Sequence, residues 1–256
     1  MKFLQQFLES KAACSQPSVG RALAATLLAM HLFSNRTDAG NQLGEELEKR
    51  GWDQEKARPD LLLGLARGGV EVARPLAQRF AIPWDVLVVR KIGAPGDPEL
   101  GIGAVCEDGS PLFSKFWLRR LGLKPEDLAD TVIEKQKDLH EKVQKYRGYP
   151  LPLLPPPRHA CVVDDGLATG ITAEAAAAYL RRHGVQRLTL AVPVATPDAA
   201  RLLEKPGVLY DSVFALESPE AFGSVGSWYE DFSQVSDARV LSALHSALHS
   251  ALHSAL

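Results

Sequence analysis

The sequence predicts an α/β fold in which helices flank a parallel β-sheet. Short apolar runs alternate with longer amphipathic segments along the 256 residues, which is the pattern of strands joined by crossover helices. Apolar residues make up 46% of the chain, enough for a substantial core. One apolar run also ends in two carboxylates and a small-residue turn, followed by an alanine-rich segment. This order of strand, loop and helix is typical of ligand-binding α/β folds.

The expected elements alternate along the chain. We expect helices at residues 38–50, 70–80 and 172–182, and strands at 60–65, 85–90, 159–163 and 187–195. Pro75 should kink the second helix or end a short first segment of it.

A longer helical segment is expected within residues 114–147. Pro125 suits the first turn of a helix, and Gly148 follows its end. Its apolar stripe predicts a surface helix packed on one side only; the stripe comprises Leu128, Val132, Leu139, Val143 and Tyr146. The proline-rich residues 150–157 that follow should form an extended connector.

Composition excludes several classes of protein. The 29 basic residues nearly balance the 31 acidic ones, so no overall field favours nucleic acid or an anionic membrane. No apolar run approaches the roughly 20 residues of a membrane span. The three cysteines lack a metal-ligand spacing, which indicates reduced thiols and a cytoplasmic protein. The acid-poor first 36 residues leave an organelle-targeting segment open.

The central motif is residues 160–172, Ala-Cys-Val-Val-Asp-Asp-Gly-Leu-Ala-Thr-Gly-Ile-Thr. The start of the following helix offers free backbone N–H groups and a partial positive charge, which favour a phosphate. Asp164 and Asp165 supply acceptors for vicinal hydroxyls. Together these features fit a ribose 5-phosphate. The phosphate-binding turn comprises Gly166, Ala168, Thr169, Gly170 and Thr172. A plain turn with Thr169 or Thr172 as a helix cap is the structural alternative.

A second strand-to-helix junction, residues 65–70, places Arg67 beside Gly68 and Gly69. Exposed N–H groups next to a guanidinium suit a diphosphate, although a tight turn with an exposed arginine would look the same. Arg90 and Lys91 are expected to end the next strand. They would then reach the same edge of the sheet and neutralise a leaving diphosphate, or else remain solvated.

These motifs resemble the type I phosphoribosyltransferases, specifically the branch whose substrate is unassigned. Gly166 departs from the family pattern, which usually has an apolar residue there. The likeness covers residues 33–240, which we expect to form the phosphoribosyltransferase domain between an N-terminal extension, 1–32, and a low-complexity Ser-Ala-Leu-His tail, 241–256. Beyond the central motif it rests on residues 35–40, 65–69, 88–91, 98–104 and 228–232.

The resemblance implies a type I phosphoribosyltransferase-like sheet with a small hood, and a reaction. Residues 93–98 would form a mobile loop of the hood that excludes water from the activated sugar. 5-Phosphoribosyl 1-diphosphate would lose diphosphate to a nucleobase-like nitrogen acceptor. Mg²⁺ would be held through water by Asp164 and Asp165, and the catalytic group would be Asp164, Asp165, Arg67 and Lys91. Trp228 could stack on the acceptor.

Other functions remain open at this point. A regulator that binds the sugar diphosphate without turnover needs the same residues. A hydrolase of the activated sugar would use the same loops. No nucleic acid or membrane partner is expected, and the resemblance is compatible with a homodimer.

Overall fold

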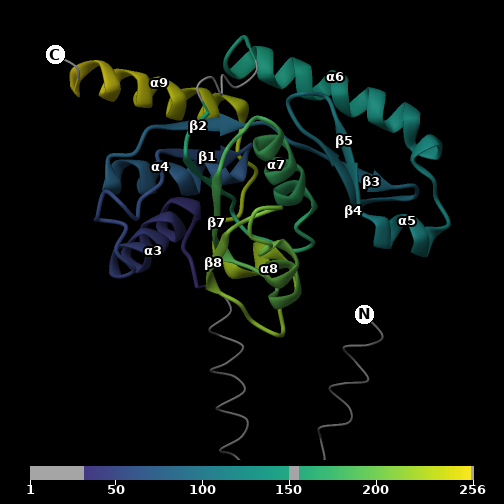
Figure 1. Ribbon diagram of the computed structural model, residues 1–256, viewed down its shortest axis with the longest axis horizontal. Helices are drawn as coiled ribbons and strands as arrows, with labels where there is room; N and C mark the ends of the chain where they lie inside the picture. The colour runs from purple at the N-terminus through teal and green to yellow at the C-terminus, as the bar shows by residue number, and fades with distance from the viewer. Residues whose placement is uncertain (1–31, 150–155, 255–256) are drawn as a thin grey trace, which may run out of the picture.

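The computed structural model describes residues 32–149 and 156–254 (Figure 1). Nearly all of the expected N-terminal extension and most of the proline-rich connector lie outside these residues. Among the helices that the structure does describe, none has the length and hydropathy of a membrane span.

The core is a five-stranded parallel sheet in the order β2-β1-β6-β7-β8. The chain passes from β1 to β2 on one side and from β6 through β7 to β8 on the other, so the strand order reverses between β1 and β6. The strands are β1 (Leu61–Leu65), β2 (Trp84–Leu87), β6 (His159–Val163), β7 (Arg187–Val194) and β8 (Ser212–Glu217).

Helices cover both faces of this sheet because successive strand side chains point to opposite faces. Leu62 and Cys161 pack with α3 and α4, whereas Leu63 and Val162 pack with α7. In Figure 1, α3 and α4 lie together, apart from α7 and α8. The helices are α3 (Arg36–Lys49), α4 (Gly68–Phe80), α7 (Ile171–Arg182) and α8 (Pro197–Leu203). The predicted α/β sheet flanked by helices is confirmed. The helix α4 continues through Pro75, so the expected short first segment was wrong.

A second, antiparallel sheet in the order β3-β4-β5 forms the hood. It corrects two predictions. The predicted strand at residues 85–90 ends at Leu87, and Arg90 and Lys91 instead begin β3. Residues 93–98 are mostly strand rather than loop, because β3 and β4 meet at a tight turn with Gly96 at φ 81°. The strands are β3 (Arg90–Ala94), β4 (Asp97–Val105) and β5 (Pro111–Phe113).

The long helical segment after the hood sheet has three pieces rather than one. They are α5 (Lys115–Leu121), the 3₁₀ turn η1 (Pro125–Leu128) and α6 (Ala129–Tyr146). Pro125 does open a helical turn. The predicted stripe is buried at Leu128, Leu139, Val143 and Tyr146 and half-buried at Val132, which confirms a helix packed on one side.

The chain ends in a short turn and a long helix, η2 (Val225–Trp228) and α9 (Asp237–Ser254). The expected domain end at residue 240 falls inside α9, and Val240, Ala243 and Leu244 are buried with hood residues. The first part of the Ser-Ala-Leu-His tail therefore belongs to a packed helix.

Candidate active site at the reversal of the sheet

The two predicted motifs meet at the point where the strand order reverses. Arg67 follows β1, and Asp164 follows the neighbouring strand β6, whose Val163 pairs with Gly64. Open α/β sheets bind ligands at the carboxyl ends of their strands at such a reversal. The fold therefore brings both motifs to the place where a ligand is expected.

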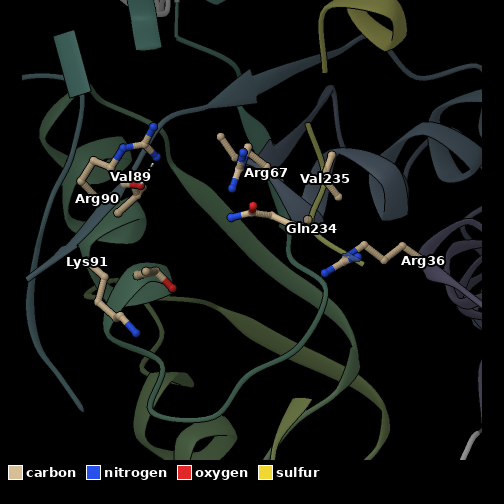
Figure 2. A pocket seen from close by; sticks show the side chains of 10 residues that line it. Arg36, Arg67, Val89, Arg90, Lys91, Gln234 and Val235 are labelled. Atoms are coloured by element: carbon tan, nitrogen blue, oxygen red, sulfur yellow. Dashed lines mark hydrogen bonds between the residues drawn. The ribbon is translucent and has the colours of Figure 1, made fainter. Parts of the chain in front are cut away.

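A cavity of about 400 Å³ opens beside this edge. That volume lies within the usual range for small-molecule sites. In Figure 2, Arg90 and Lys91 approach it from the hood, while Arg36 and Gln234 extend toward it from the opposite side. The lining comprises Arg36, Ala66, Arg67, Gly68, Val89, Arg90, Lys91, Thr172, Gln234 and Val235.

Positive charge dominates the cavity wall, and carboxylates only partly offset it. Arg36 Nε donates to Asp165 Oδ2 at 2.7 Å, and Arg90 pairs with Asp138 of α6. Across residues 32–149 and 156–254, Arg67 forms no ion pair. The cavity is consequently suited to an anion, with the guanidinium of Arg67 available for it.

The two helices that start at this edge lack side-chain caps. At the start of α7 the N-cap residue is Gly170, at φ 79°, which has no side chain to cap with. At the start of α4 it is Arg67, whose side chain makes no cap hydrogen bond. Elsewhere, Asn35, Ser114 and Thr196 cap α3, α5 and α8 through their side chains. Thr169 and Thr172 are therefore not caps, and the first N–H groups of α4 and α7 remain available to an anion.

Glycines allow the loop after β1 to touch the acidic pair. A Cβ on Gly68 would lie 1.9 Å from Asp165 Oδ2, and one on Gly69 would lie 2.3 Å from the Val163 carbonyl oxygen. Any side chain at these positions would push the two loops apart. The preceding peptide bond, Ala66–Arg67, is cis.

The acidic pair is half-buried and electrostatically coupled. Burial raises the pKa of Asp164 well above its ordinary value, and the neighbouring Asp165 carboxylate adds to this rise. Burial also raises the pKa of Asp165, although the Arg36 guanidinium opposes it. The Asp165 N–H donates to Asp164 Oδ1 at 2.9 Å, which fixes the orientation of that carboxylate.

No cluster of three or more histidine, cysteine or acidic side chains that could hold a metal occurs in the described part of the chain. Asp164 and Asp165 are thus a pair of oxygen donors without a third protein ligand. Such a pair suits Mg²⁺, which keeps several waters and completes its shell with substrate oxygens.

The predicted residues differ in their distance from the cavity. Of the predicted phosphate turn, Thr172 lines it, whereas Ala168 and Thr169 are exposed outside the lining. The acidic pair, Asp164 and Asp165, also lies outside the lining residues. Trp228 lies outside the lining. It packs in an aromatic cluster, and its indole N–H donates to the Phe222 carbonyl oxygen at 2.9 Å.

Sequence reasoning assigned no role to Arg36, Gln234 or Val235. The segment containing Arg36 supported the family resemblance, but its partner Asp165 is 129 residues away, so no local pattern pairs them. Gln234 and Val235 follow an aromatic segment, and long-range contacts of the folded chain, such as that of Arg36 with the Ser233 carbonyl oxygen, hold them at the cavity. Nothing in their spacing predicts this position.

Comparison with known proteins identifies the family of the chain. Residues 41–225 match the family model for the phosphoribosyl transferase domain. Two strains of Mycobacterium tuberculosis have relatives named "Putative phosphoribosyl transferase", each 38% identical over 216 residues, or 84% of this chain and 47% of the relative. The chain thus spans about half the length of these curated relatives.

One solved structure resembles this chain over nearly the whole length of the solved protein. The crystal structure of TT1426 from Thermus thermophilus is 35% identical, with a TM-score of 0.65, and the match covers 84% of this chain and 98% of that one. The family model, the fold and the position of the cavity agree: the chain belongs to the type I phosphoribosyltransferase family.

Proposed function

We propose that this protein transfers 5-phosphoribose from 5-phosphoribosyl 1-diphosphate to a nucleobase-like nitrogen acceptor, with Mg²⁺ as cofactor. One observation carries the proposal. The uncapped N-termini of α4 and α7 meet beside a cationic cavity where the strand order reverses. Two anion-binding helix ends at one site match a substrate that carries phosphate groups at both ends.

The diphosphate end fits the loop after β1. Arg67 supplies a guanidinium that forms no ion pair with any described residue, and Gly68 and Gly69 supply backbone N–H groups at the start of α4. Arg90 and Lys91 line the same cavity from the hood (Figure 2). Negative charge that develops on the departing diphosphate would be stabilised from both sides.

The sugar phosphate end fits the loop after β6. The 5-phosphate would lie on the N-terminus of α7, where Gly166, Ala168 and Gly170 bring the backbone close and Thr169 and Thr172 offer hydroxyl donors. Asp164 would accept hydrogen bonds from the ribose hydroxyls. Asp165 would act mainly through Arg36, which already occupies one of its oxygens.

The residues present fit a magnesium ion bound through water. Asp164 and Asp165 would hold it, and the bound cation would offset charge on the diphosphate and the ribose oxygens. The protein's own share of the chemistry is to bind both ends of the sugar and to exclude water. The C1–O bond to diphosphate breaks, a C1–N bond to the acceptor forms, and the acceptor's proton passes to solvent.

The direct test is a turnover assay with 5-phosphoribosyl 1-diphosphate, Mg²⁺ and a panel of nucleobases. We expect diphosphate release that depends on one acceptor, together with a phosphoribosylated product identified by mass spectrometry. Binding without release across the panel would indicate a regulator. Release without any acceptor would indicate a hydrolase.

An arginine variant tests the assignment of the diphosphate end. Arg67→Ala should weaken binding of 5-phosphoribosyl 1-diphosphate by about 2 kcal/mol, because a charge-assisted hydrogen bond is lost. Ribose 5-phosphate should bind as before. Arg74→Ala, at an exposed position of the same helix, is the matched control. Equal losses for both ligands would remove Arg67 from the leaving-group role.

A further inference from the structure

Residues 229–236, here called the C-terminal connector, link η2 to α9 and form one wall of the cavity through Gln234 and Val235. We propose that the side-chain amide of Gln234 binds the diphosphate group of the substrate directly. The inference rests on the proposed function, and it assigns a ligand contact to a residue outside the motifs of the family.

Gln234 is positioned to reach a ligand. Figure 2 shows its side chain extending into the cavity between Arg36 and Arg67. It is an uncharged amide within a lining that also contains Arg36, Arg67, Arg90 and Lys91. An amide N–H can donate to a phosphate oxygen without adding charge, and its oxygen can accept from a neighbouring guanidinium.

The connector is fixed immediately before Gln234. Arg36 Nη1 donates to the Ser233 carbonyl oxygen at 2.9 Å, and its guanidinium lies 3.9 Å from the centre of the Phe232 ring. The Tyr229 hydroxyl donates to the Asp165 carbonyl oxygen at 2.6 Å. The backbone that carries Gln234 is therefore held against the acidic pair.

The connector is also fixed immediately after Gln234. The Asp237 carboxylate accepts hydrogen bonds at 2.7 Å from Lys142, Lys145 and Tyr146 of α6. Val235, on the same wall, is buried among hood residues. Anchors on both sides fix the backbone that carries the amide before the ligand arrives, which lowers the backbone entropy that binding must overcome.

The position of Gln234 distinguishes the two ends of the substrate. It lies beside Arg67, on the diphosphate side, whereas the 5-phosphate is assigned to the start of α7. Loss of the amide should therefore weaken binding of diphosphate and leave ribose 5-phosphate unaffected. Loss of wall structure in general would weaken binding of both.

Two substitutions of Gln234 test whether binding depends on its hydrogen-bond donor or only on the shape of its side chain. Gln234→Met keeps the length but removes the amide, and Gln234→Glu keeps the shape but puts an acceptor and a negative charge in place of the donor. With calorimetry in Mg²⁺, we expect inorganic diphosphate to bind roughly 10-fold more weakly to Gln234→Met, as for a lost hydrogen bond to a charged group. For Gln234→Glu the loss should be larger still.

Gln186→Glu is the matched control, because Gln186 is exposed near the opposite edge of the sheet; it should bind both probes like the wild type. Unchanged diphosphate affinity in both Gln234 variants would overturn the inference, and so would equal loss of ribose 5-phosphate binding. This binding experiment needs no turnover, so it is independent of the transferase assay. If the Gln234 variants lose diphosphate binding selectively but the wild type transfers no phosphoribose, only the proposed transferase activity is refuted.

Discussion

Asp164 is a residue whose position costs stability. Burial and the adjacent Asp165 carboxylate raise its pKa, and across the described residues it forms no ion pair that would offset this cost. Such destabilised carboxylates are typical of functional sites. The position of Asp164 therefore favours ligand binding at the expense of the stability of the fold.

Asp164→Asn should therefore stabilise the protein at neutral pH while impairing function. A raised pKa in the folded state means that stability is lost as the pH rises from about 4, the unfolded value, through the folded-state pKa. Asparagine cannot ionise and keeps the oxygen that accepts from the Asp165 N–H. We expect a higher denaturation midpoint than wild type at pH 7, with the difference shrinking as the pH approaches 4.

Asp53→Asn is the control for this comparison, because Asp53 is exposed and forms no ion pair among the described residues. Its denaturation midpoint should match that of the wild type at both pH values. A lower midpoint for Asp164→Asn at pH 7 would show that the carboxylate stabilises the fold, and the argument from burial would be wrong.

At the scale of elements, the turn between β6 and α7 is shaped by its neighbour η2. A Cβ on Gly166 would lie 2.4 Å from Val225 Cγ1 and 3.2 Å from Val194 Cγ1. Val225 of η2 therefore fills the space that a side chain at position 166 would need.

Because Val225 fills this space, substitutions at Gly166 and Val225 should compensate for each other in stability. Gly166→Ala alone should lower the free energy of unfolding by about 1–3 kcal/mol, as expected for overpacking. Val225→Ala alone should also destabilise the protein, because it leaves a cavity. The double variant should be more stable than the sum of the single effects predicts. Strictly additive values in denaturant titrations would contradict the contact.

Elements with a clear local signal in the sequence could be predicted, and elements without one could not. The acidic pair and the glycine pair are contiguous motifs, so the strand-to-helix junctions at Asp164 and Gly68 were placed correctly. The change from β2 to β3 was missed because Leu87, Val88 and Val89 are all buried, and a continuous apolar run shows no break. Arg36 could not be paired with Asp165, since that contact exists only in the folded chain.

At the scale of the whole molecule, one carboxylate joins the hood to the core. Asp237 lies at the start of α9, which packs beside β2 and α4. Its partners Lys142, Lys145 and Tyr146 belong to α6, and this helix lies over the hood sheet (Figure 1). Burial alone would raise the pKa of Asp237, but the hydrogen bonds from these partners lower it below its ordinary value. The two sheets are thereby connected beside the cavity wall.

Removing this charge should loosen the hood from the core. A lowered folded-state pKa means that the stabilisation is present above about pH 4 and is lost as the pH falls below that value. Asp237→Asn should therefore reduce the free energy of unfolding by about 1–2 kcal/mol at pH 7, with a smaller deficit in acid. Hydrogen exchange should increase in both α6 and α9, because each helix loses its anchor on the other. Glu141→Gln, an exposed change on α6, should leave both helices protected, and exchange that increases in α9 alone would show that the cluster does not couple the hood to the core.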